Sequence, residues 1–330
     1  MGLVNRGWEV HLRDLKPENE EMAAARGAGE ASPIANPDLV IIAVNPHSTA
    51  GLIEKALVEW PNAIVTDVAS VKSLITDELD GNPEISRYVG SHPMAGSERS
   101  GPLAASGNLF QGRPWAVCAH PTSSEAAVAL VELAATDLGA TLVHLDPQSH
   151  DLAVAMVSHV PHVMATLTAA QLIGAEKDHL ALAGPGLRDV TRIAASDPAL
   201  WQQILKANSE AVGQALTKIR ADLDVLINSL ATGSEVEPVL SAGRAGTSLL
   251  PGRHGGADAA LGRVFVQVAD KPGELQRLMA ATAAANVNIE DIRIDHELGR
   301  EVGIVEVTVR AEKADSLVEN LLSNDWTAYR

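Results

Sequence analysis

Asp38-Leu39-Val40-Ile41-Ile42-Ala43-Val44 is an acidic residue followed by a continuous apolar run. Runs of this kind form strands that are buried on both faces of a parallel sheet. Working outward, periodicity and turn residues predict strands at residues 8–14, 63–67, 87–90, 114–118 and 141–145, and helices at 18–26, 49–60, 70–79 and 124–138. This alternation is typical of right-handed βαβ units, so residues 1–147 are expected to form a doubly wound α/β domain.

The composition restricts the classes of function. Of 330 residues, 46% are hydrophobic and 3% aromatic, as in an ordinary globular protein of two or three domains. The net charge of -17 argues against nucleic acid or an anionic membrane as the main partner, because both require a basic face. Cys118 is the only cysteine, which excludes a disulfide within the chain, and no Cys/His spacing indicates a zinc site. Because we find no apolar signal core and no run of about 18 apolar residues, we expect a cytoplasmic enzyme or regulator.

The strand pattern stops near residue 148, and residues 148–232 are expected to be helical. One helix is predicted over residues 199–230, with Asp197 as N-cap, Pro198 in the first turn and Gly233 as the stop. Apolar residues at steps of mostly three and four form one stripe along this helix: Leu205, Val212, Leu216, Ile219, Leu223, Leu226 and Leu230. Because the stripe is long for a single domain, we expect part of it to form the interface of a homodimer.

The last part of the chain is expected to be a separate small domain. Residues 233–261 are rich in Gly, Ser, Arg and Pro and are predicted to be a linker. Residues 262–330 follow with predicted strands at 263–268, 288–295 and 302–309 and predicted helices at 273–285 and 314–322. The order β-α-β-β-α is that of a ferredoxin-like α+β domain without its final strand.

The beginning of the chain lacks the glycine-rich turn with which a dinucleotide-binding sheet starts. Residues 1–7 have the character of the end of a helix that leads directly into the strand at 8–14. Asp14 then stands where an acid binds the ribose 2′-hydroxyl of NAD and repels the 2′-phosphate of NADP, although a solvated acid at a strand end fits equally. We therefore expect an N-terminally incomplete domain, with the first strand and the phosphate loop encoded upstream.

A candidate base lies in Ser91-His92-Pro93-Met94-Ala95-Gly96-Ser97-Glu98-Arg99-Ser100-Gly101, which follows the strand predicted at 87–90. Pro93 fixes its own φ, and Gly96 and Gly101 permit turns that other residues disfavour, so this segment is predicted to be a shaped loop. Such loops often carry function. His92 is accordingly a candidate base or, alternatively, a hydrogen-bonded structural residue.

Four other segments combine with this one. Asp67-Val68-Ala69-Ser70-Val71-Lys72 places a Ser and a Lys at the carboxyl end of a strand, where ligands of open α/β sheets bind. The other three are His150-Asp151, Ser158-His159-Val160-Pro161-His162 and Arg188-Asp189-Val190-Thr191-Arg192-Ile193-Ala194. Singly, each has an ordinary explanation as a helix-capping Ser, a satisfied core His or a surface Arg. Their joint occurrence indicates a site.

In this order, the segments closely resemble the prephenate dehydrogenases, a family of tyrosine biosynthesis that includes arogenate and cyclohexadienyl dehydrogenases. The resemblance covers residues 8–230 and rests on the SVK, SHPMAGSE, SHVPH and DVTRIA motifs with the SDP and LW that follow. It implies a Rossmann domain followed by a helical dimerisation domain. It also implies NAD as cofactor and the oxidative decarboxylation of prephenate to 4-hydroxyphenylpyruvate.

The resemblance also implies roles for single residues. His92 is expected to be the catalytic histidine that accepts a hydrogen bond from the ring hydroxyl of the substrate, and Ser70 is expected to fix that histidine and the nicotinamide. Arg192 is expected to grip a substrate carboxylate in bidentate fashion. The other expected substrate-binding residues are His159, His162 and three acids of an ionic network at the pocket mouth, Glu98, Asp151 and Asp189. The expected cofactor-binding residues are Asp14, Val44 and Ser70.

The C-terminal module resembles an ACT domain, a small amino-acid-sensing fold, over residues 262–326. The motifs are Val268-Ala269-Asp270-Lys271-Pro272-Gly273-Glu274-Leu275 and Asn286-Val287-Asn288-Ile289. Pro272-Gly273 makes a tight turn into a helix N-terminus whose free amides can receive a carboxylate, although an ordinary βα turn in a structural appendage is the alternative. The expected regulatory residues are Asp270, Gly273 and Asn288, and L-tyrosine is the expected effector.

Other functions are compatible with the same residues. Arogenate can replace prephenate, because the two substrates differ only in the keto or amino group of the side chain. A non-catalytic amino-acid-binding regulator is the alternative from another class, because the N-terminal domain lacks its phosphate turn. A general 3-hydroxyacid dehydrogenase is less favoured, since it gives no reason for the pair His159 and His162.

Overall fold

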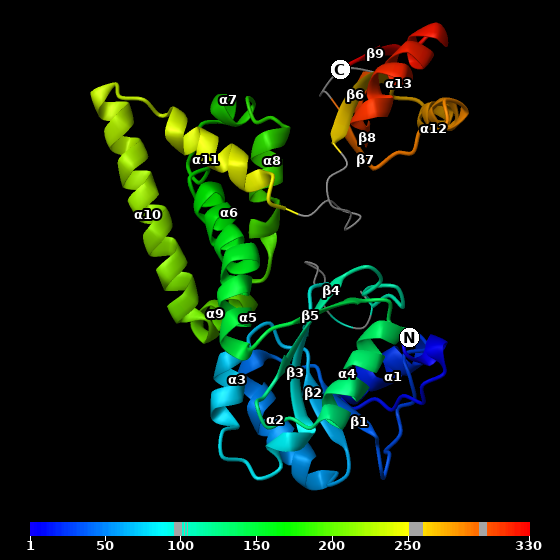
Figure 1. The fold of residues 1–330 in the computed structure, drawn as a ribbon, viewed down its shortest axis with the longest axis vertical. Coiled ribbons are helices and arrows are strands. Elements are labelled where there is room, and N and C mark those ends of the chain that lie inside the picture. Colours follow the sequence, from blue (N-terminus) through cyan, green and yellow to red (C-terminus); the bar gives the residue numbers. More distant parts are fainter. Residues whose placement is uncertain (96–100, 102, 104, 251–259, 297–301) are drawn as a thin grey trace. The chain divides into compact units, whose positions relative to one another are not determined.

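The computed structural model describes residues 1–330 except 96–100, 102, 104, 251–259 and 297–301 (Figure 1). Within these bounds the chain divides into two units, Met1–Leu223 and Asp224–Arg330. Each unit has buried apolar clusters of its own.

A five-stranded sheet in the order β1-β2-β3-β4-β5 forms the centre of the first unit. Its strands are β1 (Leu39–Ile42), β2 (Ile64–Asp67), β3 (Tyr88–Pro93), β4 (Pro114–Ala119) and β5 (Thr141–His144). β1, β2 and β3 are parallel, β4 is antiparallel to β3, and β5 is parallel to β4. Helices join the parallel pairs, as crossover connections require.

Helices cover both faces of this sheet (Figure 1). The covering helices are α2 (Pro46–Glu59), α3 (Ser73–Glu78) and α4 (Glu125–Asp137). The helix α1 (Pro17–Ala25), which buries no residue, and short 3₁₀ turns at Val4–Arg6 and Ile85–Arg87 complete this part of the chain. Ile53 of α2 belongs to one apolar cluster with Val65 of β2, and α3 contributes to the same cluster. Val131 of α4 belongs to another cluster with Val117 of β4. The sheet is thus the middle of three layers, and the predicted α/β class is confirmed.

The apolar run at residues 38–44 forms β1, but it is not buried on both faces. β1 lies at the edge of the described sheet, and Ile41 is 36% exposed. The strand predicted at 8–14 is also wrong, because only an isolated parallel bridge joins His11 to Glu30. An alternating pattern becomes a strand only where a neighbouring strand pairs with it. Here the pairing is limited to two backbone hydrogen bonds, in which the Leu12 N–H donates to the Glu30 carbonyl and the Glu30 N–H donates to the Val10 carbonyl.

The segment that begins at Ser91 starts as a strand rather than as a loop. β3 continues through His92 and Pro93, which pair with Ala116 and Trp115 of β4. An antiparallel partner satisfies the backbone of these residues, and Pro93 stands at the end of the strand, where its missing N–H does least harm. Glu98 lies outside the described residues.

The rest of the first unit is helical, as predicted. Its elements are α5 (Pro147–Val154), a π-helical turn (Ala155–His159), α6 (Val160–Ala170), α7 (Lys177–Leu180), α8 (Pro185–Thr191), a 3₁₀ turn (Arg192–Ala195), α9 (Pro198–Ala207) and α10 (Ser209–Thr232). The continuous stretch Pro147–Ala170 is long and apolar enough to cross a membrane by length and composition. However, four polar side chains within it are buried, which is typical of a core helix: His150, Asp151, His159 and His162.

The single helix predicted over 199–230 is in fact two helices. Asp197 caps α9 through a hydrogen bond from the Ala199 N–H, as predicted. The helix then breaks at Asn208, whose backbone leaves the helical region at φ -117° and ψ 33°. The apolar stripe continues across the break, so periodicity alone does not reveal it.

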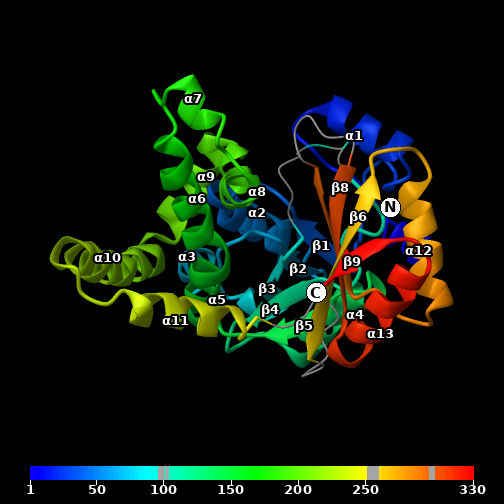
Figure 2. The same cartoon turned by 90° about the horizontal axis from the view of Figure 1, so that it is seen from above.

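Within the described residues, the second unit contains the end of α10 and one further helix before its sheet. α11 (Glu237–Thr247) occupies part of the predicted linker at 233–261. The sheet and its helices are β6 (Leu261–Ala269), α12 (Glu274–Ala284), β7 (Asp291–His296), β8 (Val302–Arg310), α13 (Ala311–Ser323) and β9 (Thr327–Tyr329). The strand order is β7-β8-β6-β9, all antiparallel, and both helices lie on one side of the sheet (Figure 2). β9 is the final strand that the sequence pattern lacked, so the complete β-α-β-β-α-β order is present.

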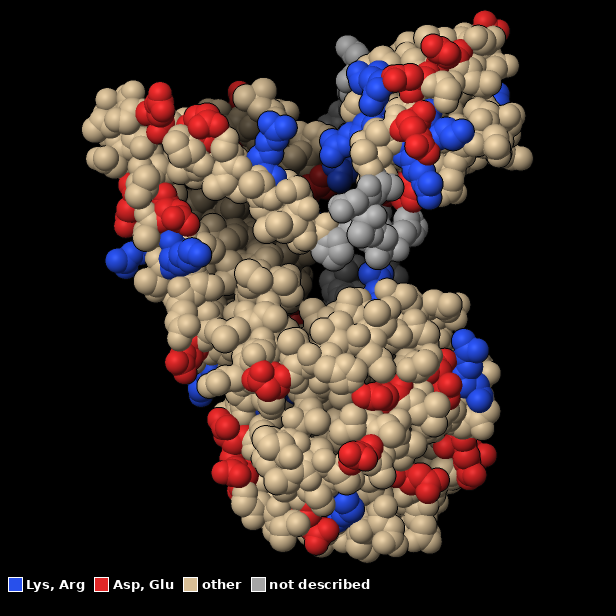
Figure 3. Space-filling view, in the orientation of Figure 1, with Lys and Arg blue, Asp and Glu red and all other residues tan. Residues whose placement is uncertain are grey.

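Both units carry acidic and basic side chains. Figure 3 shows mainly acidic side chains, with some basic ones, scattered among neutral ones on the first unit, and basic side chains intermixed with acidic ones on the C-terminal module. Partly exposed ion pairs in that module include Arg263–Glu306 and Arg330–Asp315. Such pairs contribute about 0–1 kcal/mol each, so the buried apolar cluster stabilises the module more than they do.

Gly90 is the position in β3 where a larger residue is expected to do the most damage. An added Cβ would lie 3.0 Å from the Tyr88 Oη and 3.1 Å from both the Cys118 carbonyl oxygen and the Lys72 Cδ. Gly90→Ala is therefore expected to lower the free energy of unfolding by about 1–3 kcal/mol in urea titrations. Gly213→Ala is the control, because open space surrounds that helical glycine, and it is expected to stabilise by roughly 0.5–1 kcal/mol. Equal effects of the two substitutions would contradict the crowding.

Candidate active site

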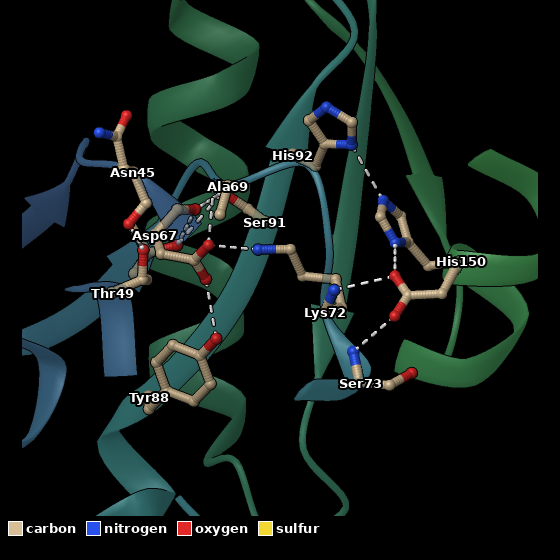
Figure 4. Close-up of polar contacts among 12 residues, drawn as sticks. Asn45, Thr49, Asp67, Ala69, Lys72, Ser73, Tyr88, Ser91, His92 and His150 are labelled. Carbon is tan, nitrogen blue, oxygen red and sulfur yellow. Dashed lines mark hydrogen bonds and ion pairs between the residues drawn. The ribbon is translucent and has the colours of Figure 1, made fainter. Parts of the chain in front are cut away.

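A fully buried ionic group holds the carboxyl end of β2. The Lys72 ammonium pairs with Asp67 Oδ1, and both side chains are fully buried. The same carboxylate accepts the Tyr88 hydroxyl at 2.7 Å and the Ala69 N–H at 2.8 Å (Figure 4). Burial, followed by the neighbouring Asp67 charge, raises the pKa of Tyr88 well above its ordinary value, so Tyr88 stays a hydroxyl donor. The turn that carries Ser70 is thereby fixed.

His92 is the first member of a hydrogen-bonded chain that starts at the end of β3. Its Nδ1 lies 3.0 Å from His150 Nε2, and His150 Nδ1 lies 2.8 Å from Asp151 Oδ1 (Figure 4). The two Asp151 oxygens also accept the backbone N–H groups of Lys72 and Ser73, each at 2.8 Å. One chain of hydrogen bonds thus connects β3, α5 and the start of α3.

The electrostatic environment keeps His92 neutral. Burial lowers its pKa well below the ordinary value, the neighbouring His150, Lys72 and His159 act in the same direction, and Asp151 opposes them. Burial raises the pKa of Asp151, but hydrogen bonds from His150 and from the Ser73 and Lys72 N–H groups outweigh it, and the net pKa is lowered. At neutral pH, the His92 ring is therefore neutral and the Asp151 carboxylate is ionised.

A second cluster lies where the α9–α10 junction meets α5 and α6. The Asn208 amide donates to the Asp151 carbonyl at 2.8 Å and to His159 Nδ1 at 3.2 Å. The His162 ring stacks on Trp201 with centroids 3.4 Å apart and an angle of 2° between the planes, and His159 meets the same indole edge-on at 6.0 Å. Among the described atoms, the buried His162 Nδ1 has no hydrogen-bond partner.

Two sequence profiles match the chain. One, described as the nucleotide-binding domain of prephenate dehydrogenase, matches residues 3–144, and the other, described as the dimerization domain of prephenate dehydrogenase, matches residues 146–240. "Probable prephenate dehydrogenase NovF" of Streptomyces niveus is 35% identical over 344 aligned residues, which cover 99% of this chain and 95% of that protein. The chain belongs to the prephenate dehydrogenase family.

Other relatives agree with this family. The prephenate dehydrogenase of Bacillus subtilis is 30% identical, over 70% of this chain and 64% of its own length. The crystal structure of prephenate dehydrogenase from A. aeolicus, in complex with hydroxyphenyl propionate and NAD+, is 27% identical with a TM-score of 0.67 and covers 75% of this chain and 91% of its own. The chain is accordingly a dehydrogenase with a Rossmann-like nucleotide-binding domain and a helical dimerisation domain, and the family resemblance is confirmed.

Among the residues expected from the prephenate dehydrogenase resemblance, those of the histidine-rich segments come together. His92, Asp151 and His159 belong to one hydrogen-bonded group through His150 and Asn208. Asp151 does not lie at a pocket mouth, because it is 5% exposed and bonded to backbone amides. Its carboxylate is already occupied within the protein.

The other expected residues lie outside this hydrogen-bonded group. Ser70 is half-buried after β2, and its hydroxyl makes no hydrogen bond to the described residues. Val44 is 42% exposed just after β1, and Arg192 and Asp189 are exposed. Asp14 does not end a strand, because its Oδ1 accepts the Lys16 N–H at 2.9 Å and the Asn19 amide at 3.1 Å before α1.

Sequence reasoning did not identify four residues that shape the site: Asp67, His150, Trp201 and Asn208. Asp67, His150 and Trp201 stood within quoted motifs without a role of their own, and His150 directly precedes Asp151, to which one was given. The signal at Asp67 and His150 was a polar residue inside an apolar strand or helix. Asn208 carried a weaker signal as a polar residue between Leu205 and Val212 of the stripe.

The buried His159 is expected to make stability depend on pH. Burial lowers its pKa from 6.5 to about 4. The unfolded chain binds this proton more readily than the folded one, so the contribution is complete above pH 6.5 and is lost as pH falls toward 4. The urea midpoint of the wild type is therefore expected to fall between pH 7 and pH 5, and that of His159→Asn to fall less. An identical fall in both proteins would contradict this assignment.

Proposed function

We propose that the protein is a cytoplasmic, NAD-dependent prephenate dehydrogenase that converts prephenate to 4-hydroxyphenylpyruvate. The observation that carries this proposal is the neutral His92 at the carboxyl end of β3, in a chain of the prephenate dehydrogenase family. Ligands of open α/β sheets bind at that edge.

The reaction needs a group of this kind. The carbinol carbon of the substrate loses hydride as its hydroxyl becomes a ketone, so positive charge develops at the hydroxyl. A neutral imidazole that accepts a hydrogen bond from that hydroxyl stabilises the developing charge, whereas an imidazolium has no lone pair to offer. Loss of carbon dioxide then aromatises the ring. His92 is therefore assigned the role of base.

The described residues fit the nicotinamide half of NAD. β1, β2 and β3 are parallel, so their carboxyl ends meet at one edge, and there Val44 is exposed and the Ser70 hydroxyl makes no bond to described residues. The turn after β1 is Val44-Asn45-Pro46 rather than glycine-rich, so within the described residues it is not a phosphate cradle. When bound, NAD supplies the hydride acceptor. Val44 and Ser70 are assigned to it, and Asp14 is the proposed ribose ligand.

Arg192 is the proposed ligand of a substrate carboxylate. It is exposed in the 3₁₀ turn that packs against α6, the helix that carries His162. Because a guanidinium binds the carboxylate equally in the ground state and the transition state, Arg192→Gln is expected to raise KM about tenfold or more with little change in kcat. Arg220→Gln on the exposed face of α10 is the control. A lowered kcat at unchanged KM would remove Arg192 from carboxylate binding.

His159, His162, Glu98 and Asp189 are the other proposed substrate ligands. The stacked pair His162–Trp201 offers a flat aromatic surface, and the unpaired His162 Nδ1 offers a polar contact. Prephenate and arogenate differ at the side chain, so parallel assays of NADH formation with each substrate test the choice between them. We expect the larger kcat/KM with prephenate, and a larger value with arogenate would make the protein an arogenate dehydrogenase.

The helical stretch Pro147–Ala170 is proposed to join two copies of the chain. Four large apolar side chains of Pro147–Ala170 are 52 to 67% exposed: Leu152, Met156, Val157 and Leu167. Residues 146–240 match the dimerization domain of the family, so a second copy is the proposed occupant of this surface. Light scattering at micromolar concentration is expected to give the mass of a dimer. A monomer would contradict the assignment.

We propose in addition that the C-terminal module is an ACT domain that binds L-tyrosine. Gly273 opens the 11-residue α12 at φ 93°, and the Glu274 N–H donates to the Lys271 carbonyl. The N–H groups of Leu275 and Gln276, which follow it, are the proposed ligands of a carboxylate. Asp270 precedes this turn and Asn288 follows the end of α12, and both are exposed. Asp270→Ala and Asn288→Ala are expected to weaken inhibition by L-tyrosine while turnover is retained. Unchanged inhibition would place tyrosine in the active site instead.

A further inference from the structure

We propose that His150 is a positioning residue that holds His92 in the tautomer with its proton on Nδ1, and that Asp151 orients His150 for this task. The inference rests on the proposed function in one respect, namely that His92 Nε2 receives the substrate hydroxyl. The hydrogen bonds themselves belong to the protein without any ligand.

The direction of each hydrogen bond follows from Asp151. Its Oδ1 accepts the Lys72 N–H and its Oδ2 accepts the Ser73 N–H, so the carboxylate is surrounded by donors. An ionised carboxylate only accepts, and the bond at 2.8 Å from Oδ1 to His150 Nδ1 therefore requires the proton to be on that nitrogen.

The tautomer of the second ring then fixes that of the first. A neutral His150 with its proton on Nδ1 has a lone pair on Nε2. His92 Nδ1, 3.0 Å away, must donate to that lone pair, which leaves His92 Nε2 without a proton. The relay, which is the chain of hydrogen bonds from Asp151 through His150 to His92, thus leaves free the nitrogen that is needed to accept the substrate hydroxyl.

The relay is rigid enough to hold this arrangement. His150 is 1% exposed and Asp151 is 5% exposed, and the Asp151 carbonyl accepts the Asn208 amide at 2.8 Å. The helix that carries both residues begins at Asp146, whose side chain caps the Ser149 N–H at 2.9 Å. The same helix packs against α3 and β4, so the two rings are held from three elements.

Charged and titratable groups face this relay from three elements. Asp151 is the negative neighbour from α5, Lys72 brings a positive charge from the β2–α3 turn, and His159 faces the group from the π-helical turn. Acid is expected to abolish activity through protonation of His92 at Nε2, the nitrogen that the relay leaves free.

Substitutions at His150 separate positioning from folding. His150→Phe keeps the ring but removes both nitrogens, and His150→Gln can place an amide oxygen where Nε2 accepts the His92 proton. We expect His150→Phe to lower kcat about 10- to 100-fold with KM near the wild-type value, and His150→Gln to regain most of that loss. His144→Phe on β5 is the control, because His144 is bonded only to Glu132 at the surface. A wild-type kcat in His150→Phe would overturn the proposal.

Nitrogen NMR of the unliganded full-length chain tests the tautomer itself. With ¹⁵N-labelled histidine, long-range correlations distinguish protonated from bare ring nitrogens, and the signals lost in His92→Asn assign His92. We expect a protonated Nδ1 and a bare Nε2 in the wild type, and a shift toward protonated Nε2 in His150→Phe. A protonated Nε2 in the wild type would overturn the proposal. If the wild type turned over neither substrate, the proposed function would fail while this spectrum would still decide the relay.

Discussion

His92→Asn is expected to lower kcat by about 10²- to 10⁴-fold while KM stays near the wild-type value. In the proposed mechanism the imidazole contacts the hydroxyl that becomes a ketone, so its hydrogen bond strengthens as hydride leaves and contributes mainly to the transition state. The low pKa of His92 supports this role, because the ring keeps its lone pair throughout the neutral range. The asparagine side chain is polar, but its amide oxygen is only a very weak base.

The measurement is NADH formation at saturating NAD over a range of prephenate concentrations. His144→Asn is the matched control, because its side chain is 59% exposed on β5 and pairs with Glu132. The control is expected to keep wild-type kcat and KM. Unchanged turnover in His92→Asn would remove His92 from the chemistry and leave it a structural residue.

Lys72→Met is expected to destabilise the first unit by about 3–5 kcal/mol. The Lys72 and Asp67 side chains are both fully buried, so removal of the ammonium leaves the Asp67 carboxylate in the interior without its counter-charge. Tyr88 and Ala69 still donate to the carboxylate, but neither carries a positive charge. The desolvated anion is the source of the large effect.

Urea unfolding monitored by circular dichroism measures this effect, and Asp67→Asn combined with Lys72→Met completes a double-mutant cycle. The double substitution is expected to be less destabilising than the sum of the two single ones, because it leaves neither charge alone. Additive effects of the two substitutions, or a loss below about 1 kcal/mol for Lys72→Met, would show that the pair is not coupled.

The sequence predicted those parts of the fold that depend on local signals. Asp197 was identified as an N-cap from residue type alone, and its side chain accepts the Ala199 N–H. Ser124 likewise opens α4 and accepts the Ala127 N–H, at the start of the helix predicted over 124–138. These interactions span two or three residues, so the pattern contains all the information that decides them.

Other features depend on residues far away in the chain. His92 lies in a strand because β4 begins more than 20 residues later and pairs with it. The break at Asn208 is stabilised by bonds to Asp151 and His159, which are 57 and 49 positions away. β9 has only three residues, too few for a visible alternation, and it forms because β6 offers an edge. No local pattern contains these partners.

The candidate site shows the same division. The types of residue at His92, His159 and His162 pointed to one region of the fold, but their partners did not follow from spacing. The role of His150 arises because a helix begun at Asp146 brings its ring to the end of β3, a contact across 58 positions. Only the folded structure reveals that Nδ1 is the nitrogen of His92 that bonds to His150.

The most direct test of the central claim is the stoichiometry of the reaction with prephenate and NAD. The account predicts that each molecule of prephenate consumed by the wild type yields one NADH, one carbon dioxide and one 4-hydroxyphenylpyruvate, and that His92→Asn forms the same products far more slowly. Consumption of prephenate without NADH, or equal rates in the two proteins, would contradict it.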